Sequence, residues 1–237
     1  MENSNKHIII TGASKGIGKA IANGFAAEGA TLYICARNEI DMYTAIAQIQ
    51  TNCPNSIVLG KVVDMAIKAE VLAFAAWVNA QCTPDIIVNN AGQFLPGSVY
   101  NEADGLLEKL IETNLYSAYY LTRALLPKMM EQKKGYIFNI CSIASLQAYS
   151  NGGSYSISKF ALMGFSKNLR EELKPYNIKV AAVYPGAVLT NSWGNYDNST
   201  HRIMEATDVA TMILAATKLS AAAVIEDIVL RPQQGDL

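Results

Sequence analysis

A tyrosine and a lysine four residues apart, Tyr155 and Lys159, lie in the otherwise small and apolar run GGSYSISKFALMGF. In a helix this spacing places both side chains on one face, one turn apart. A free tyrosine has a pKa of about 10, too high for an acid–base group near neutral pH. A nearby ammonium group stabilises the phenolate. The pair is therefore a candidate proton-handling centre, although chance often supplies the same spacing.

Three glycines, Gly12, Gly16 and Gly18, stand between the first expected strand and the first expected helix, in IIITGASKGIGKAI. Such a turn lets the backbone approach a pyrophosphate that lies on the helix N-terminus. The spacing GxxxGxG differs from the GxGxxG fingerprint, and the Gly-Lys-Ser/Thr of a P-loop is missing. We expect a nucleotide site here, with a plain strand–helix turn as the alternative.

The end of the second expected strand decides between two dinucleotides. In YICARNE, Ala36 and Arg37 stand where an acidic residue would bind the ribose of NAD, and no acid precedes Glu39. Lys15 in the glycine turn can reach the same region. Two cations favour the 2′-phosphate of NADP, which a guanidinium binds through paired hydrogen bonds. The alternative is two solvated surface cations, and we predict NADP(H).

Four further segments follow strands of the expected sheet. Asp64 follows the third strand and is suited to accept a hydrogen bond from an adenine amine. NNAG (89–92) follows the fourth strand, Ser142 follows the fifth, and YPGAVLT (184–190) ends the sixth. Open α/β sheets bind ligands at the carboxyl ends of their strands. These segments therefore predict one cleft at that edge.

The elements that must place these residues alternate along the chain. Strands are expected at 7–11, 31–36, 57–63, 85–89, 135–141, 178–184 and 226–230, and helices at 16–28, 39–51, 66–81, 103–130, 154–173 and 207–219. Nearly continuous apolar strands indicate a parallel sheet covered on both faces, and right-handed crossovers make it doubly wound. We predict one α/β domain over 1–237, with a substrate lid at about 187–205.

Composition excludes several functional classes. The formal net charge of −1 leaves no broad basic face for nucleic acid. The first ten residues lack the pattern of a signal peptide, and no apolar run approaches the ~18 residues of a membrane helix. Four cysteines without CxxC spacing indicate reduced thiols in a cytoplasmic protein. With only His7 and His201, the chain lacks the residues for a histidine metal cluster or a Ser-His-Asp triad.

Taken in order, these motifs resemble the short-chain dehydrogenase/reductase family, in its compact single-domain NADP-dependent branch, over essentially the whole chain. The matching segments are TGASKGIG (11–18), Asp64, NNAG (89–92), Asn114 in ETNL, Ser142, YSISK (155–159) and PGAVLT (185–190). The resemblance implies a Rossmann-type doubly wound parallel sheet of order 3-2-1-4-5-6-7, with helices on both faces. It also implies a catalytic set of Asn114, Ser142, Tyr155 and Lys159.

The resemblance assigns a role to each member of this set. It implies that Tyr155 protonates the carbonyl oxygen of a substrate while NADPH delivers hydride to the carbon. Ser142 is then a hydrogen-bond donor to that oxygen, and Lys159 also binds the nicotinamide ribose. The backbone carbonyl of Asn114 is expected to hold a water that relays protons to Lys159.

Two groups of contacts follow. The expected cofactor contacts are Gly12, Ser14, Lys15, Gly16, Ile17, Gly18, Arg37, Asn38, Asp64, Met65, Asn90, Ala91, Gly92, Tyr155, Lys159, Pro185, Gly186, Val188 and Thr190. The expected substrate contacts are Phe94, Ser142, Tyr149, Tyr155 and Trp193, with Leu95 and Tyr196 beside them. Arg202 is either a partner for a substrate carboxylate or an exposed lid cation.

The sequence leaves two classes of substrate open. Through residue 190 the chain resembles 3-oxoacyl-[acyl-carrier-protein] reductases, which usually end in a stretch resembling TGxxxxVDGG. This chain ends in VIEDIVLRPQQGDL, and its V-x-R-P pattern is more similar to NADP-dependent carbonyl, hydroxy-acid and sepiapterin-type reductases.

Two expectations concern partners and the class of protein. Segments 103–130 and 154–173 carry apolar faces, which in the family build a dimer interface, and only 16% of residues are charged. We therefore expect a homodimer or homotetramer. The alternative from another class is a non-catalytic NADP-binding sensor or scaffold. Such proteins typically lose the tyrosine, the lysine or the serine, and all three are present here.

Overall fold

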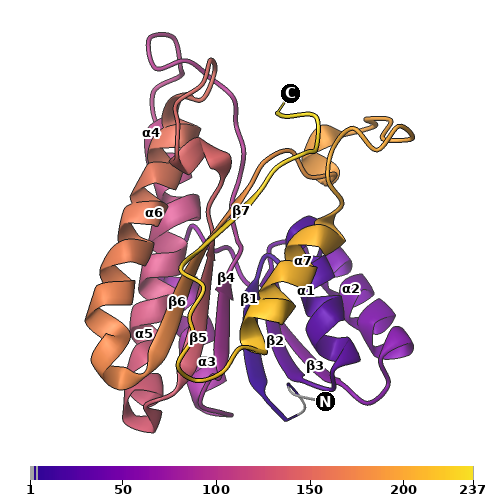
Figure 1. Ribbon diagram of the computed structural model, residues 1–237, viewed down its shortest axis with the longest axis vertical. Helices are drawn as coiled ribbons and strands as arrows, with labels where there is room; N and C mark the ends of the chain where they lie inside the picture. Colours follow the sequence, from indigo (N-terminus) through magenta and orange to yellow (C-terminus); the bar gives the residue numbers. More distant parts are fainter. Residues whose placement is uncertain (1–2, 4, 237) are drawn as a thin grey trace.

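Seven parallel strands form one sheet in the order β3-β2-β1-β4-β5-β6-β7 (Figure 1). The computed structural model describes residues 3 and 5–236. All neighbouring strands run parallel, which confirms the predicted fold class and strand order. The strands are β1 (His7–Thr11), β2 (Thr31–Ala36), β3 (Ile57–Val62), β4 (Ile86–Asn89), β5 (Gly135–Ile140), β6 (Ile178–Pro185) and β7 (Asp227–Leu230).

The central strand β1 shows why the sheet is buried on both sides. Successive side chains of a strand point to opposite faces, yet Ile8, Ile9 and Ile10 are all fully buried. In register, Ile9 lies between Tyr33 of β2 and Ile87 of β4. Continuous apolar runs therefore mark strands with a helical layer on each face.

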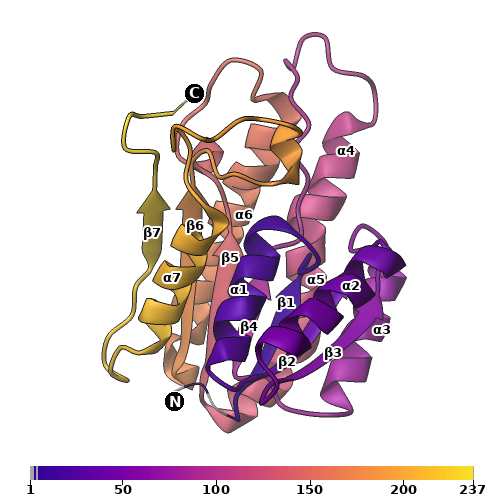
Figure 2. The ribbon, with the colours of Figure 1, turned by 90° about the vertical axis from the view of Figure 1, so that its right-hand side faces the viewer.

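Helices supply those layers (Figure 2). One face is covered by α1, α2 and α7, and the other by α3, α5 and α6. No helix in the described part of the chain is long and apolar enough to cross a membrane. The helices are α1 (Gly16–Ala27), α2 (Glu39–Asn52), α3 (Lys68–Asn79), α4 (Leu106–Ile111), α5 (Ser117–Gln132), α6 (Gly153–Leu173) and α7 (Ala206–Thr217).

The helix expected at 103–130 is three elements, which corrects that prediction. α4 begins after Gly105, whose φ of 85° lies in the left-handed region and prevents the helix from starting earlier. A π-helical segment, Glu112–Tyr116, then joins α4 to α5. Such segments are frequent at functional sites, and this one carries Asn114.

The segment 187–205 is folded against itself. It contains a short 3₁₀ helix, Asn191–Trp193, and a bridge that pairs Val188 with Met204 at its two ends. The Asn198 side chain accepts a hydrogen bond from Ile203 N at 3.0 Å and donates one to Ile203 O at 3.0 Å. The predicted lid is thus a loop with a closed base, and its role as a lid stays a prediction.

A chain of buried polar side chains ties the sheet to its helices. Asn89 Nδ2 on β4 donates to Asn139 Oδ1 on β5 at 2.7 Å and to Thr122 Oγ1 on α5 at 2.9 Å. Asn139 Nδ2 in turn donates to Ser166 Oγ on α6 at 2.8 Å. A buried hydrogen bond of this kind contributes roughly 1 kcal/mol. These hydrogen bonds fix the position of α6 relative to β4 and β5.

We expect Asn139→Ala to lower the free energy of unfolding by about 1–3 kcal/mol, because it removes the link between β5 and α6 in a buried site. Urea denaturation measures the change. Asn168→Ala is the matched control, since Asn168 is exposed on α6 and its side chain donates to Gly164 O of the same helix at 2.9 Å. Equal stability losses for the two variants would contradict the role of Asn139.

Candidate active site

Two of the catalytic candidates meet where β5 ends and α6 begins. Both Tyr155 and Lys159 lie on α6. Lys159 Nζ is 5.9 Å from the centroid of the Tyr155 ring and donates a hydrogen bond to Ile140 O at 2.8 Å. Lys159 is buried, with 5% of its surface exposed. The one-turn spacing thus places an anchored ammonium group beside the tyrosine ring.

The Tyr155 hydroxyl is held in its neutral form. Burial raises the pKa of Tyr155 to about 12, and a hydrogen bond with Ser142 opposes that rise. We expected Lys159 to lower this pKa, and for the protein by itself that expectation is wrong. Burial is the main cause of the raised pKa, and the Lys159 ammonium donates its hydrogen bond to the Ile140 carbonyl. At neutral pH the side chain is therefore a proton donor.

The same burial acts on the lysine in the opposite direction. It lowers the pKa of Lys159 to about 8, because the charged form of a lysine loses its hydration, while Cys141 opposes the change. Lys159 is therefore positively charged at neutral pH and close to its titration point. A group in that state can carry charge or pass a proton.

Ser142 is fixed by a short turn of its own. Its Oγ accepts a hydrogen bond from Ala144 N at 3.1 Å, and Ser145 Oγ accepts from Ser142 N at 3.3 Å. This capping box opens the 3₁₀ helix Ile143–Ser145. Since the Ser142 Oγ–H remains a donor, the hydroxyl can bond to an oxygen beside Tyr155.

Asn114 stabilises the segment that follows β4. Its Oδ1 accepts from Gln93 N at 2.7 Å, and its Nδ2 donates to Gln93 O at 3.1 Å. Nδ2 also donates to Ser158 Oγ at 2.9 Å on α6. The side chain is fully buried. Asn114 therefore joins the π segment, the loop after β4 and the helix that carries Tyr155.

Gly92 packs closely against Asn114 and Lys159. A Cβ at this position would lie 3.2 Å from Asn114 Oδ1 and 3.4 Å from Lys159 Nζ. The expected cofactor contact at Gly92 therefore lies beside the catalytic candidates.

The glycine turn has the shape expected of an anion site. Gly12 and Gly16 have φ values of 64° and 54°, and a Cβ at Gly18 would overlap the Gly12 carbonyl oxygen. Asn90 Nδ2 donates to Gly12 O at 3.0 Å, which ties the turn to the end of β4. α1 begins without a side-chain cap, so its first amides are open to an anion.

The two cations expected near the adenosine end differ. Lys15 Nζ forms an ion pair with Asp41 at 2.7 Å, so its charge is partly neutralised. Arg37 is exposed and makes no ion pair with any other residue that the structure describes. Asn38 caps α2 by accepting from Asp41 N at 2.8 Å. Arg37 is therefore the available cation of the two.

Asp64 and Met65 are less available than expected. Asp64 Oδ1 accepts from Ala66 N at 3.0 Å, which leaves its second oxygen as an acceptor. The Met65 side chain is buried, and Cys35 Sγ lies 3.6 Å from its sulfur. Only the backbone of Met65 can therefore meet a nucleotide.

The segment that follows β6 approaches the glycine turn. A Cβ at Gly16 would lie 3.1 Å from Thr190 Cγ2, so the two segments face each other closely. Gly186 N donates to Leu230 O at 2.8 Å and so links the turn to β7. Among the remaining contacts expected here and in the glycine turn, Pro185, Val188, Ala91, Ser14 and Ile17, the first two are buried and the others partly exposed.

Two of the aromatic substrate candidates lie at Tyr155. The Phe94 ring meets the Tyr155 ring edge to face, with centroids 4.9 Å apart and planes at 84°. Tyr149 is close enough to oppose ionisation of Tyr155. Trp193 instead packs on Tyr196 within 187–205, at 5.3 Å.

The position of Arg202 differs from both expectations, a partner for a substrate carboxylate and an exposed lid cation. Its Nη1 donates to Gly235 O at 2.9 Å and its Nη2 to Asp236 O at 3.2 Å. The guanidinium thus fastens the C-terminal segment to 187–205, and is neither free for a substrate nor a bare surface cation.

Three contributors to the site were missed from the sequence. Ser158 accepts from Asn114 and donates to Tyr155 O at 2.7 Å, and its place inside YSISK was the available signal. Thr11 Oγ1 accepts from Asn90 N at 3.0 Å and from Ala91 N at 2.9 Å. The Ile140 carbonyl carries no sequence signal, because any residue offers a backbone oxygen.

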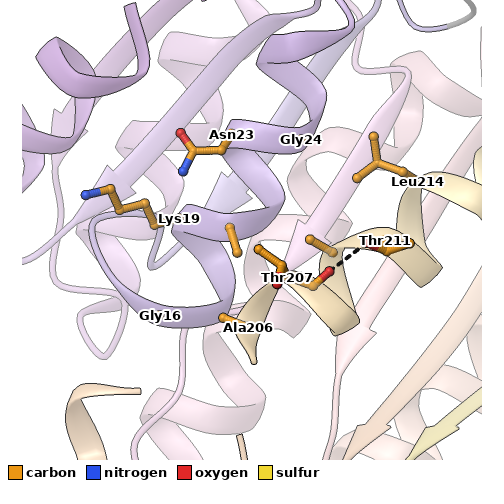
Figure 3. Close-up of a pocket in the computed structure, with 10 residues that line it drawn as sticks. Gly16, Lys19, Asn23, Gly24, Ala206, Thr207, Thr211 and Leu214 are labelled. Atoms are coloured by element: carbon orange, nitrogen blue, oxygen red, sulfur yellow. Dashed lines mark hydrogen bonds between the residues drawn. The ribbon is translucent and has the colours of Figure 1, made fainter. Parts of the chain in front are cut away.

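An open groove of about 520 Å³ lies between α1 and α7, apart from the catalytic candidates, and Gly16 of the glycine turn lines one end of it (Figure 3). Gly24 lets the helices approach, since a Cβ there would lie 2.5 Å from Leu214 Cδ1. Its polar rim is occupied internally: Lys19 donates to Gln48, and Thr211 Oγ1 donates to Thr207 O at 2.8 Å. The groove therefore marks the contact between small residues of α1 and α7, and the catalytic candidates do not line it.

The fold and this site define a class: a Rossmann-type α/β protein with a half-buried tyrosine and a buried lysine one helical turn apart at the carboxyl edge of its sheet. The family described as short chain dehydrogenase matches residues 6–200. The chain belongs to this family of oxidoreductases.

Named relatives span nearly the whole chain. A sepiapterin reductase of Chlorobaculum tepidum is 31% identical, with 98% of each chain covered. The structure of L-sorbose reductase from Gluconobacter frateurii, complexed with NADPH and L-sorbose, is 28% identical, with a TM-score of 0.89 and 97% of each chain covered. A 3-oxoacyl-[acyl-carrier protein] reductase from Brucella melitensis is 26% identical, with a TM-score of 0.87, and the match covers 97% of this chain and 91% of that one.

We expect Lys159 to lose its proton at about pH 8, whereas the ordinary lysine pKa is 10.5. Burial disfavours the ammonium form, so the positive charge is present below that pH and is lost as the pH rises through it. NMR titration of the protein labelled with ¹³C at lysine Cε measures this, and Lys159→Met assigns the signal by removing it. A Lys159 signal that titrates together with those of the exposed lysines would contradict the burial argument.

Proposed function

We propose that this protein is an NADP(H)-dependent oxidoreductase that reduces a carbonyl group to a secondary alcohol. The observation that carries the proposal is the buried Tyr155 hydroxyl, which shares a hydrogen bond with Ser142 and has the Lys159 ammonium beside its ring. A neutral hydroxyl next to a second donor and a fixed cation suits the delivery of one proton to a carbonyl oxygen.

Each residue has a distinct part in the proposed reaction. NADPH, when bound, supplies the hydride that reduces the carbonyl carbon. Tyr155 donates its hydroxyl proton to the carbonyl oxygen, and Ser142 donates a hydrogen bond to that oxygen while negative charge develops there. The positive charge of Lys159 stabilises the phenolate that remains on Tyr155. Lys159 then returns a proton to Tyr155, and we assign to the Asn114 carbonyl the water that resupplies Lys159.

Residues of the first two βα turns fit the proposed cofactor. The uncapped N-terminus of α1 and the glycine turn offer backbone amides to a pyrophosphate. Arg37, which is exposed and has no ion pair among the described residues, offers its guanidinium to the 2′-phosphate of NADP, while Lys15 shares its charge with Asp41. The NADPH complex of L-sorbose reductase supports this choice, because that protein shares the fold over 97% of this chain.

For the substrate we propose a small ketone or diketone rather than a carrier-protein thioester. The closely packed Phe94 and Tyr155 rings give the cleft an aromatic wall. The sepiapterin reductase relative matches this chain over nearly its whole length. The V-x-R-P ending of this chain also favours a small carbonyl substrate over a carrier-protein thioester. A 3-oxoacyl thioester stays in the assay panel because the relative from Brucella melitensis carries that activity in its name.

We also propose that the protein works as a homodimer or homotetramer. Ile157 and Phe160 on α6, and Tyr116 beside α5, are exposed apolar side chains on adjoining helices. Burying such a face in a symmetric contact removes apolar area from water.

We expect Tyr155→Phe to lower kcat by about 10²–10⁴-fold, the usual contribution of a positioned acid, and to leave NADPH affinity unchanged. NADPH consumption at 340 nm, over ketones, diketones, hydroxy acids, pterins and 3-oxoacyl thioesters, measures turnover, and fluorescence titration measures binding. Tyr43→Phe, on the exposed surface of α2, is the control. Unchanged turnover in Tyr155→Phe would refute the role of Tyr155. A native protein that binds NADPH and reduces nothing in the panel would favour the sensor or scaffold reading.

We expect Arg37→Asp to shift the ratio of kcat/KM for NADPH to that for NADH by roughly tenfold to a hundredfold towards NADH. A lost charge-assisted hydrogen bond is worth about 1.5–3 kcal/mol, and the new carboxylate repels the 2′-phosphate. Lys167→Asp makes the same change of charge on the exposed surface of α6. If both variants keep the native ratio, Arg37 does not select the cofactor.

A further inference from the structure

The loop after β4, residues 93–105, forms one wall of the candidate site. It rises at the carboxyl edge of the sheet, next to the loop that leads into α6 (Figures 1 and 2). Its second residue, Phe94, holds the edge-to-face contact with Tyr155. The position of this loop therefore decides where the aromatic wall stands relative to the proposed proton donor.

One carboxylate joins the far end of this loop to the helix that carries Tyr155. Glu102 Oε1 accepts a hydrogen bond from Ser154 N at 2.8 Å, and Glu102 Oε2 accepts one from Ser154 Oγ. Ser154 is buried and directly precedes Tyr155. The α6 N-terminus has no side-chain cap of its own, so Glu102 supplies the missing cap from another element.

The surroundings of Glu102 are built to admit this carboxylate. Gly153, with a φ of 36°, has no room for a Cβ, which would overlap Glu102 Oε1. A Cβ at Gly97 would lie 2.7 Å from Glu102 Cγ. Two glycines, one from each segment, therefore leave space for the Glu102 side chain between them.

Two further hydrogen bonds fasten the same pair of segments. Gly97 N donates to Asn151 O at 3.1 Å, and Ser98 Oγ donates to Asn151 Oδ1 at 3.0 Å. At its other end the loop is held by Asn114, which bonds both backbone groups of Gln93. Phe94 thus lies between two anchors, one at Gln93 and one at Glu102.

We propose that Glu102 is a positioning residue for the carbonyl substrate: it locks the Phe94 wall to the first turn of α6, next to Tyr155. The inference rests on the proposed reductase function and adds a residue outside its catalytic set.

Glu102 bonds the far end of the loop, whereas the proposed cofactor contacts at 90–92 precede the loop and are held at the Gln93 end by Asn114. Lys159 is held separately by the Ile140 carbonyl, and the glycine turn and Arg37 lie on other strands. Glu102 therefore governs carbonyl binding more than NADPH binding.

The kinetic test compares Glu102→Ala, Glu102→Gln and Glu108→Ala in the full chain. The probe is 1-phenyl-1,2-propanedione, a small aryl diketone, with NADPH. We expect Glu102→Ala to raise KM for the diketone about tenfold or more, since small misplacements in a site are costly, while the Kd for NADPH stays within about twofold. Glutamine keeps an acceptor for Ser154 N and a polar partner for Ser154 Oγ, so Glu102→Gln is expected to restore most of the loss. Glu108→Ala, on the exposed side of α4, is expected to behave like the native chain.

A second measurement needs no turnover. Hydrogen–deuterium exchange of the peptides that cover 93–105 and the first turn of α6 is expected to quicken in Glu102→Ala and to stay native-like in Glu102→Gln. If exchange does not change in Glu102→Ala, or if KM and the NADPH Kd rise together, the positioning role is overturned. Such results leave the proposed function standing, because that depends on Tyr155→Phe. If Tyr155→Phe keeps its activity, the proposed function fails whatever exchange shows.

Discussion

The site depends on one hydrogen bond, from the buried Lys159 ammonium to the backbone carbonyl of Ile140. A buried cation is costly unless it is paired with a charge or a strong acceptor, and here the acceptor is the last peptide of β5. The bond fixes the distance between the central sheet and the second turn of α6. Once that distance is set, Tyr155 stands one turn earlier on the helix, and Ser142 stands two residues later on the chain than the acceptor.

Around this bond, buried polar side chains align α6 with the neighbouring loop and strand more narrowly than apolar packing does. Asn114 bonds the loop after β4 through both backbone groups of Gln93 and reaches Ser158 on α6. Asn139 on β5 bonds the same helix at Ser166. Apolar contacts tolerate small sliding, whereas a buried hydrogen bond has a narrow range of distance and angle. The helix that carries the reacting groups is therefore held from the π segment and from β5.

The sheet and the catalytic candidates could be predicted because each left a local signal. Uninterrupted apolar runs such as Ile8–Ile10 mark parallel strands, and their order follows from the family motifs. The π segment could not be found, since the sequence 112–116 is ordinary helix material and the shift of its hydrogen bonds depends on what Asn114 contacts. The ion pair of Lys15 with Asp41 and the tether of Arg202 to the C-terminal segment were missed for a related reason. Each joins groups whose distance only the folded chain determines.

The pair formed by Asn89 and Asn139 has a consequence for how the chain avoids misfolding. β4 and β5 are apolar on both faces, so burial alone scarcely distinguishes the native alignment of these strands from one shifted by a residue. In the native alignment the two amides lie opposite each other. A shift would move one amide to the other face of the sheet and leave both buried without their partner, at a cost of about 1–3 kcal/mol for each. Two asparagines in an otherwise apolar pair of strands thus favour the native alignment over the shifted one.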